Sequence, residues 1–497
     1  MSEWGFYGRQ EPLGALREML SAERWFFCRI EGRRRIGKTS LLGQLAKEDL
    51  KLGSRFVYMQ VPDSDERDVA ATFAQSLSRS EVDSVVKKSS GVNSFMTMAA
   101  AIGELCAEGF IVVLDEFQYF TRSKLSAFNS FLQAEVDRLR EASLKQGGLF
   151  VLGSLQSEMN ALLDDRAAPL YGRITSRISL DHWDFDDLLA VFDAHGVREP
   201  SQWLTLWTFF EGVPKFYKDA FERGLFDVGS KDLASQLLAK MFINSSSPLS
   251  EEADTWFLRE LRGRAVSILN YLANNAGCSH GDITANVSGD DSNALGTHIV
   301  RLVDHYKMVD KLQPIFSGEK SRNARYYIAD NFLQAWLSVA KPAREEAKLK
   351  PVDRVLPPVL RKLETLEGFA FEKLIRRIHV EASKKNKGDF ELSEIKLGYW
   401  NRTKDSLKSI EIDLVASNSS EKIIRFGSCK RSDVSHDLMV FERHVSEFMK
   451  VRENKKLADW KRQMVLFSPK FSEAKRQMYE SKGYLVRDLE DYARLFR

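Results

Sequence analysis

Cysteine is scarce in this 497-residue sequence, and the four that occur, Cys28, Cys106, Cys278 and Cys429, include no CxxC pair. A disulfide framework or a structural zinc site is therefore not expected. No uncharged apolar run approaches the roughly 18–20 residues that a membrane-spanning helix needs. The first residues, MSEWGFYGRQEPL, lack the basic and then apolar pattern of a signal peptide. We therefore expect a cytoplasmic protein with no membrane partner.

Hydrophobic residues are not scarce: they make up 43% of the chain, and charged residues make up 29%. This composition excludes global disorder, and the length predicts three or four domains of roughly 100–200 residues each. The net charge of +3 hides an asymmetry, because residues 341–497 hold 35 basic and 25 acidic side chains while the rest holds 38 and 45. A basic C-terminal third is compatible with a nucleic-acid partner, and a solvated lysine-rich surface is the alternative.

Four short apolar runs in the first 180 residues predict strands. They are Trp25–Glu31, Arg55–Val61, Phe110–Leu114 and Leu149–Gly153. Their nearly continuous apolar character favours strands that are buried on both faces, as in a parallel sheet covered by helices. The N-terminal region is therefore expected to be an α/β layer structure.

Residues 32–39 read GRRRIGKT, which fits the phosphate-binding pattern G-x-x-x-x-G-K-[ST]. The glycines let the chain wrap a phosphate with its own N–H groups, and the N-terminus of the following helix adds partial positive charge. Lys38 is expected to reach the β- and γ-phosphates of ATP, and the Thr39 hydroxyl is expected to bind Mg²⁺. A basic turn with glycines at this spacing by accident is the alternative. The predicted nucleotide-binding residues of this loop are Gly32, Arg33, Arg34, Arg35, Ile36, Gly37, Lys38, Thr39 and Ser40.

Two adjacent carboxylates follow the third apolar run, in the segment FIVVLDE. Asp115 is expected to hold Mg²⁺ together with Thr39, as a cofactor-binding and metal-binding residue. Glu116 lies just beyond the strand end, where it would orient and activate the attacking water as a general base. Lys38 and Glu116 are thus the first two predicted catalytic residues.

The segments FYGRQEPLGAL, GRRRIGKTSLL and VVLDEFQYF resemble the ATPases of the STAND class, especially the archaeal-type ATPase family. The resemblance covers about residues 3–340 and implies three further site residues. Arg173, in the segment PLYGR, would sense or stabilise the γ-phosphate as a third catalytic residue, or else be a salt-bridged surface residue. Ser154 would be a polar γ-phosphate sensor, and Pro214, in the segment GVP, would lie near the base. The resemblance also implies an ATP-dependent homo-oligomer.

Residues 185–255 show a helical pattern that predicts a lid, and residues 256–341 predict a winged helix. In the latter, helices at Arg262–Asn275, His280–Val287 and Ser292–Tyr306 precede strands at Met308–Phe316 and Ala324–Ile328 around a polar tip. Such a unit binds DNA or serves as a packing module. Four of the twelve prolines lie at 342–358, which predicts a stiff linker and a domain boundary.

Three segments of the last region, residues 359–497, resemble the restriction-endonuclease-like PD-(D/E)xK superfamily: GFAFE, SIEIDLVA and RFGSCK. The resemblance implies Mg²⁺-assisted phosphodiester hydrolysis, with Glu372 and Asp413 as metal ligands and Lys430 assisting the water or the transition state. Ser428 occupies the position where the superfamily has an acid. Glu411 is expected to share a strand face with Asp413 and could replace that acid. The alternative is an inactive domain that binds nucleic acid or protein.

The sequence therefore predicts an α/β multidomain protein. Its parts are a P-loop ATPase core (1–184), a helical lid (185–255), a winged helix (256–341), a linker (342–358) and a nuclease-like α/β domain (359–497). We expect an ATP- and Mg²⁺-dependent switch that acts on DNA, with a C-terminal domain whose nuclease activity is weak or absent. An ATP-dependent signalling or assembly scaffold without nucleic-acid chemistry is the alternative.

Overall fold

The structure is a computed structural model of residues 1–497. It describes all of them except 1–2, 49–52, 143, 245, 248, 250, 257, 259–260, 262, 288–291, 319–322, 395, 402, 404 and 406–407. The chain forms two compact units. The first comprises Gly5–His182 with the short segment Val213–Lys215, and the second comprises mainly Trp183–Gly212 and Phe216–Arg497.

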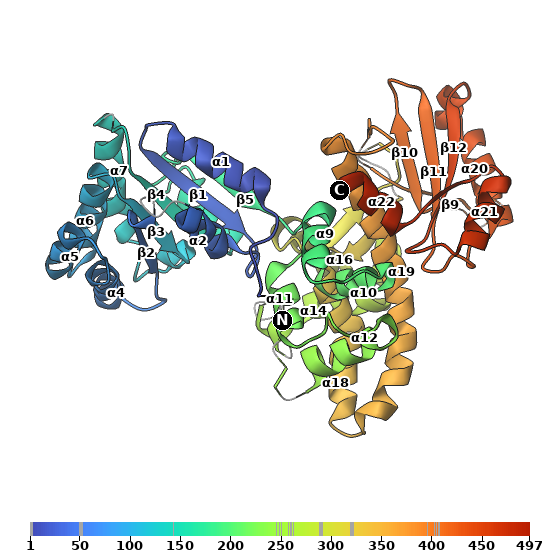
Figure 1. Ribbon diagram of the computed structural model, residues 1–497, viewed down its shortest axis with the longest axis horizontal. Helices are drawn as coiled ribbons and strands as arrows, with labels where there is room; N and C mark the ends of the chain where they lie inside the picture. The colour runs from blue at the N-terminus through green and yellow to red at the C-terminus, as the bar shows by residue number, and fades with distance from the viewer. Residues whose placement is uncertain are drawn as a thin grey trace. The chain divides into compact units, whose positions relative to one another are not determined.

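The first unit is built on a parallel five-stranded sheet in the order β2–β3–β4–β1–β5 (Figure 1). Four strands lie on the predicted apolar runs. The fifth strand, β5, has no apolar run in the sequence. It lies at the sheet edge beside β1, where only two of its five side chains are buried. The strands are β1 (Phe26–Gly32), β2 (Phe56–Gln60), β3 (Ile111–Asp115), β4 (Gly148–Gly153) and β5 (Ser176–Leu180).

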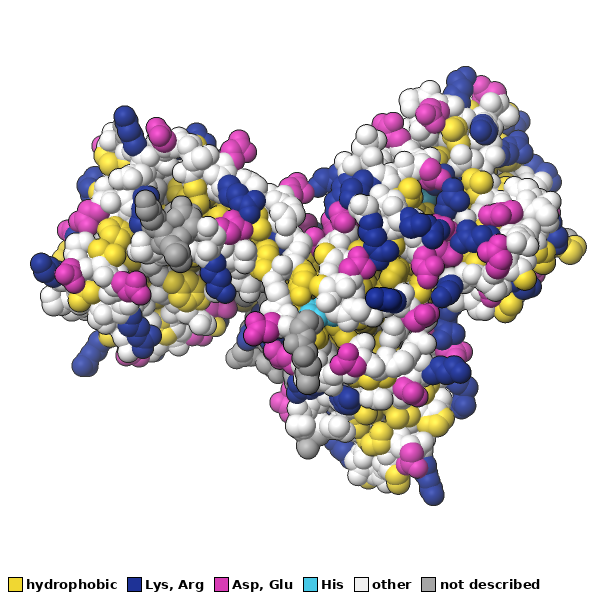
Figure 2. All heavy atoms as spheres, viewed as in Figure 1, with side chains coloured by type: hydrophobic (Ala, Val, Ile, Leu, Met, Phe, Trp, Pro, Cys, Tyr) yellow, Lys and Arg dark blue, Asp and Glu magenta, His cyan; other side chains and the backbone are white. Residues whose placement is uncertain are grey.

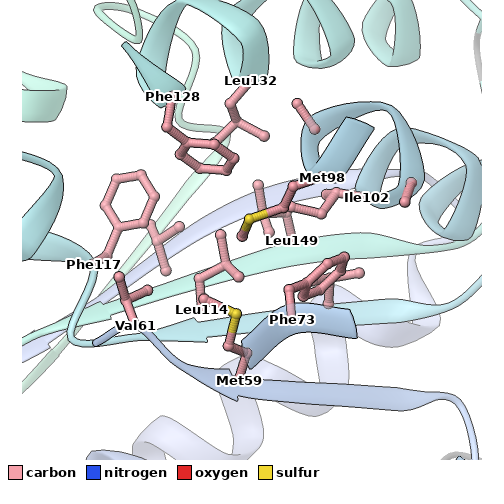
Figure 3. Close-up of a cluster of buried hydrophobic side chains, with 14 of the residues drawn as sticks. Met59, Val61, Phe73, Met98, Ile102, Leu114, Phe117, Phe128, Leu132 and Leu149 are labelled. Atoms are coloured by element: carbon pink, nitrogen blue, oxygen red, sulfur yellow. The ribbon is translucent and has the colours of Figure 1, made fainter. Parts of the chain in front are cut away.

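Helices cover both faces of this sheet, which explains its continuous apolar strands. On one face, Ile111 and Val113 of β3 pack with α1 (Gln10–Ser21) and α2 (Lys38–Glu48). On the other face, the intervening side chains Val112 and Leu114 belong to the cluster drawn in Figure 3. That cluster receives α4 (Glu66–Ser78), α6 (Phe95–Ala107), α7 (Phe128–Glu141) and α8 (Gln156–Leu163).

The second unit begins with helices, as the sequence predicts for residues 185–255. They are α9 (Phe185–Ala194), α10 (Pro200–Phe210), α11 (Pro214–Glu222), α12 (Ser230–Leu238) with the short turn η3 (Ala239–Ile243), and α13 (Glu252–Trp256). Every residue of α10 except Ser201 is buried, including both tryptophans, so this helix lies inside the unit. Such burial on all sides explains why its sequence shows no amphipathic period.

Three helices and an antiparallel hairpin follow in the predicted order. They are α14 (Arg264–Asn274), α15 (His280–Val287), α16 (Ser292–Val300) extended by η4 (Arg301–His305), β6 (Val309–Leu312) and β7 (Arg325–Ile328). Of the predicted polar tip of the hairpin, residues 319–322 lie outside the described residues.

The segment predicted as a stiff linker, 342–358, is instead mostly helical. After α17 (Asn331–Ala335) and η5 (Trp336–Ala340), α18 spans Lys341–Ala347 and α19 spans Val352–Lys384 with two prolines inside it. A buried apolar stripe running from Val355 to Ala382 compensates for the roughly 3 kcal/mol that an internal proline costs. Among the described residues, no helix is both long and apolar enough to cross a membrane.

The C-terminal part of the second unit is a four-stranded mixed sheet in the order β10–β11–β12–β13. The pair β10–β11 is antiparallel and the other two pairs are parallel. A two-stranded sheet, β8–β9, precedes it. The elements are β8 (Tyr399–Trp400), β9 (Glu411–Ile412), β10 (Leu414–Asn418), β11 (Ile423–Cys429), α20 (Leu438–Lys450), η7 (Arg452–Leu457), β12 (Lys461–Phe467), α21 (Glu473–Ser481), β13 (Leu485–Arg487) and α22 (Leu489–Phe496).

The β6–β7 hairpin is docked onto this C-terminal part. Ile315, in the loop after β6, is fully buried in the C-terminal apolar cluster, and its N–H donates to the Gly398 carbonyl at 2.9 Å. The indole N–H of Trp400 donates to the Asn323 carbonyl at 2.6 Å, and the Arg325 guanidinium lies 4.9 Å from the centre of the Trp400 ring. The hairpin therefore packs against its own chain.

A buried glutamate joins three helices of the second unit. Glu211, 3% exposed, follows α10 in a strained backbone conformation (φ 51°, ψ −107°). One carboxylate oxygen is 2.8 Å from Arg377 and 3.0 Å from Lys373, both on α19. The other accepts the N–H of Asn331 at the start of α17, at 3.0 Å. These contacts fix the turn that leads into the GVP segment.

The docking of the hairpin predicts a large effect of shortening Ile315. Ile315→Ala removes three methyl or methylene groups from a fully buried position, so we expect the free energy of unfolding to fall by about 2–4 kcal/mol. Urea unfolding followed by circular dichroism measures it. Val300→Ala, at an exposed position of α16, is the control. Equal midpoints for the two variants would contradict the docking.

Candidate active site

The predicted phosphate-binding loop connects β1 to α2, and its backbone explains its glycines. Gly32 has φ 151°, and a Cβ there would lie 2.5 Å from the Leu180 carbonyl oxygen of β5. Gly37 has φ 95°, which side chains rarely adopt. Ile36 is buried against the sheet, whereas Arg34 and Ser40 are exposed. The loop therefore turns back over the sheet edge and leads directly into the first turn of α2, as phosphate binding requires.

Lys38 lies inside this loop. Its ammonium donates to the carbonyl oxygens of Gly32 at 2.8 Å and Arg33 at 3.1 Å. Burial lowers the pKa of Lys38 to about 8, although Asp115 and Glu116 favour the charged form. A lysine held by neutral carbonyls can exchange them for phosphate oxygens, which repay its desolvation better.

The two residues predicted to hold Mg²⁺ are in direct contact. The Thr39 hydroxyl donates to Asp115 Oδ2 at 2.7 Å, and the N–H of Glu116 donates to Asp115 Oδ1 at 2.8 Å. A hydroxyl and a carboxylate at this separation are oxygen ligands of the kind that Mg²⁺ prefers, so these residues fit the ion. Tyr58, in the middle of β2, also donates to Asp115 Oδ2, at 2.9 Å. Tyr58 carries no sequence motif and was predicted only as part of a strand.

Glu116 is surrounded by polar groups from two strand ends. It has a left-handed backbone (φ 57°, ψ 35°) between β3 and the short helix η2 (Phe117–Thr121). Its Oε2 accepts a hydrogen bond from the Gln118 carboxamide and lies 3.5 Å from the Ser154 hydroxyl beyond β4. Ser154 is thus brought to the predicted general base. Gln118 is part of the site, and the sequence reasoning missed it.

Arg9 and Arg33 connect the loop to the segment that follows β5. Arg9, buried before α1, donates to the carbonyls of Asp181 at 2.6 Å and Ile36 at 3.1 Å. Arg33 lies 3.0 Å from the Nε2 of His182. The sequence signal for Arg9 was its place in the segment FYGRQEPLGAL, but that segment did not suggest a contact with the loop.

Arg173 is paired away from the loop. Its guanidinium donates two hydrogen bonds to the Asp137 carboxylate of α7, at 2.8 and 2.7 Å. This ion pair lowers the pKa of Asp137. The geometry matches the salt-bridged alternative, and a catalytic role for Arg173 requires the pair to open. Pro214 is the first residue of α11, and its place beside the base stays a prediction.

The second predicted site gathers around Asp413 in the C-terminal sheet. Asp413 Oδ2 accepts from the Lys430 ammonium at 3.0 Å and from the N–H of Cys429 at 2.8 Å. Arg376 of α19 donates to the Asp413 carbonyl and lies 3.8 Å from Glu372. Desolvation, followed by the charge of Asp413, raises the pKa of Glu372 to about 8. The structure thus brings Glu372, Asp413 and Lys430 together.

Two contacts bear on the prediction that Glu411 replaces the missing acid as a metal ligand. Glu411 does not share a continuous strand with Asp413, because β9 ends at Ile412 and the chain bends at Asp413, where Cys429 and Arg376 bind both ends of that residue. The bend separates the two residues into different strands, and a shared face for Glu411 and Asp413 stays a prediction. The Glu411 carboxylate is also paired with Arg325 of the docked hairpin at 2.6 Å. That pair lowers the pKa of Glu411.

Ser428 contacts His436 and belongs to a hydrogen-bond network apart from Glu372 and Asp413. Its side chain is 6% exposed, and its hydroxyl lies 3.2 Å from His436 Nδ1. The other ring nitrogen of His436 lies 3.1 Å from the Ser468 hydroxyl, which donates to the Lys430 carbonyl. Burial lowers the pKa of His436 to about 4, so the ring is neutral at pH 7. The position where the sequence resemblance implies an acid is therefore a small buried hydroxyl.

Two separate segments of the chain match known protein families. Residues 6–216 match a family described as an ATPase domain predominantly from Archaea. Residues 336–457 match a family described as archaeal and bacterial proteins of unknown function. The first segment contains the loop, Asp115, Glu116 and Pro214, so this part of the chain is similar to an ATPase domain of that family. The second contains Glu372, Asp413 and Lys430, and its description assigns them no role.

Relatives extend over most of the chain. An uncharacterized protein of Methanocaldococcus jannaschii is 25% identical over 435 residues, which are 86% of this chain and 88% of that protein. Among solved structures, a Walker-type ATPase of Pyrococcus abyssi has a TM-score of 0.49 and 18% identity over 67% of this chain and 96% of its own. The ORC2 protein of Aeropyrum pernix, in ADPNP and ADP complexes, has a TM-score of 0.49 and 15% identity over 70% and 97%.

The buried network around Ser428 predicts that an acid is poorly tolerated there. Ser428→Glu places a larger, charged side chain against the neutral ring of His436, so we expect a loss of about 2 kcal/mol or more and a lower melting temperature. Differential scanning calorimetry of the full chain measures it. Ser446→Glu, on the exposed face of α20, is the matched control. An unchanged melting temperature for Ser428→Glu would show that the network is not rigid.

Proposed function

We propose that the chain is a Mg²⁺-dependent ATPase that acts as a switch. The observation that carries this proposal is the meeting of Lys38 and Thr39 with Asp115 and Glu116 at one edge of the sheet. The loop N–H groups and Lys38 would bind the phosphates, and Thr39 and Asp115 would hold the ion. Bound Mg²⁺ would offset the charge of the β- and γ-phosphates. Glu116 would accept the proton of the attacking water.

Two variants separate binding from hydrolysis. Lys38→Ala removes the cation that faces the phosphates, so we expect nucleotide binding to be lost. Glu116→Gln keeps that cation and removes the base, so binding should stay and hydrolysis should fall by about 10²–10⁴-fold. Calorimetric titration with a non-hydrolysable ATP analogue and phosphate release measure the two. Lys47→Ala, at the exposed end of α2, is the control for lost charge. Equal loss of binding in both variants would contradict these roles.

Nucleic acid is the partner we propose for the second unit. Its support is the excess of basic residues in 341–497 and the winged-helix order of α14 to β7. Figure 2 shows several lysine and arginine side chains close together on the visible face of this unit, with acidic ones among them. Because the hairpin is docked on its own chain, we propose that η4 and its Arg301, not the wing, would face DNA. Binding of duplex DNA should weaken steeply as salt rises.

We propose that the C-terminal domain is nuclease-like with weak or absent cleavage. The proximity of Glu372, Asp413 and Lys430 supports a relation to the PD-(D/E)xK superfamily. The Lys430 ammonium lies 3.0 Å from the Asp413 carboxylate. Two features favour weak activity: the missing acid at Ser428, and the engagement of Glu411 by Arg325. Two-metal hydrolysis needs carboxylates to fix the ions, so their loss lowers cleavage more than it lowers DNA binding.

A side-by-side assay tests this part. We expect little Mg²⁺-dependent cleavage by the wild type and unchanged DNA binding by Asp413→Asn. Ser428→Glu should raise cleavage where it folds. If the wild type cleaves well, Glu411→Ala should stop it, because Glu411 would then be the substitute ligand. Cleavage that is fast and insensitive to both Asp413→Asn and Glu411→Ala would contradict the superfamily assignment.

An assembly scaffold without nucleic-acid chemistry is the second candidate, and the docked hairpin and the buried Ser428 favour it. It predicts a nucleotide-dependent homo-oligomer, in which Arg173 would leave Asp137 to reach a neighbouring subunit's nucleotide. Light scattering with and without a non-hydrolysable ATP analogue distinguishes the candidates. A mass increase without salt-sensitive DNA binding supports the scaffold, and a constant mass contradicts it.

A further inference from the structure

Gln118 donates a side-chain hydrogen bond to the predicted general base, Glu116. Its carboxamide Nε2 donates to Glu116 Oε2 and lies 3.5 Å from the Ser154 hydroxyl. Ser154 in turn lies 3.5 Å from the same carboxylate oxygen. The three side chains thus form a triangle that joins the end of β3, the first turn of η2 and the end of β4.

The carboxamide of Gln118 is held in place by packing. The side chain is 1% exposed, and Gly153 leaves room for it: a Cβ at that glycine would lie 2.9 Å from the Gln118 Oε1. The turn itself is tied down, because the Thr121 hydroxyl donates to the Gln118 carbonyl at 2.7 Å. Asn129 of α7 donates to the Phe120 carbonyl at 3.0 Å. Gln118 is therefore a rigid donor, in contrast to a mobile surface amide.

Glu116 has a left-handed backbone conformation, which is uncommon for residues other than glycine. A left-handed conformation costs a residue other than glycine roughly 1–2 kcal/mol and persists only when its surroundings hold it. The conformation also turns the chain sharply after β3, so the Glu116 carboxylate and the Gln118 carboxamide face each other. One carboxylate oxygen is then held by a neutral donor.

We propose that Gln118 is the positioning residue of Glu116. By holding Oε2, it orients the carboxylate so that the other oxygen accepts the proton of the attacking water. Gln118 acts through Glu116 and not on the nucleotide. The inference rests on the proposed ATP hydrolysis and adds to it the group that sets the geometry of the base.

The first test replaces the carboxamide by an apolar group of similar shape. In Gln118→Leu we expect kcat to fall by about ten- to hundredfold, part of the 10²–10⁴ that a general base contributes. The KM for ATP and the affinity for a non-hydrolysable ATP analogue should stay within about twofold, because the loop is untouched. Gln75→Leu, the same change at an exposed position of α4, should leave all three values unchanged.

The decisive test combines this change with Glu116→Gln. If Gln118 acts through the base, Gln118→Leu should have almost no further effect once the base is gone, because the two residues act as a unit. Equal losses in both backgrounds, or a loss that appears in nucleotide affinity, would overturn the inference. So would wild-type kcat in Gln118→Leu. A wild type that hydrolyses no ATP would overturn the proposed function as well.

Gln118→Glu keeps the shape and covers the case in which the leucine variant does not fold. Its carboxylate cannot donate to Glu116 Oε2, so the hydrogen bond is lost while the size of the side chain is kept. We therefore expect kcat to fall at least as far as in Gln118→Leu, with the affinity for the non-hydrolysable ATP analogue within about twofold. Wild-type kcat in Gln118→Glu would overturn the inference.

Discussion

The hydrogen bond between the Thr39 hydroxyl and the Asp115 carboxylate depends on one constraint: β1 and β3 run parallel and end at the same edge of the sheet. The strand order places only β4 between them. Residues 76 positions apart are thereby brought within 2.7 Å, and Ser154 reaches the same edge from β4. Helices bury both faces of the sheet, so the strands that carry these side chains lie in the core of the unit.

In the second unit, the long helix α19 connects two groups of charged residues. Two pairs of side chains one turn apart project from this helix to different partners. Lys373 and Arg377 hold the buried Glu211, whereas Glu372 and Arg376 face the Asp413 site. The turn before the GVP segment and the C-terminal acids are therefore attached to one rigid helix. The docked hairpin adds Arg325 from the other side.

The sequence was most informative where one local pattern carries the chemistry. The glycines and lysine of the loop, and the strand that ends in Asp115 and Glu116, predicted a contact that the structure contains. It was least informative where tertiary packing decides. The four prolines at 342–358 predict a linker, but burial of the α19 stripe keeps a helix through Pro357 and Pro358. Gln118 and Tyr58 carry no motif, because their contacts depend on neighbouring strands. Ser428 was recognised as a departure, but its partner His436 comes from a loop that no pattern connects to it.

The most direct test of the account is Mg²⁺-dependent phosphate release from ATP by the full chain and by Asp115→Asn. That variant keeps the size of the side chain and the loop, and it removes the charge that the ion would need. The account predicts release by the wild type with Mg²⁺, none after the addition of EDTA, and a large loss in Asp115→Asn. Equal rates in the two proteins, or no release by the wild type with Mg²⁺, would contradict it.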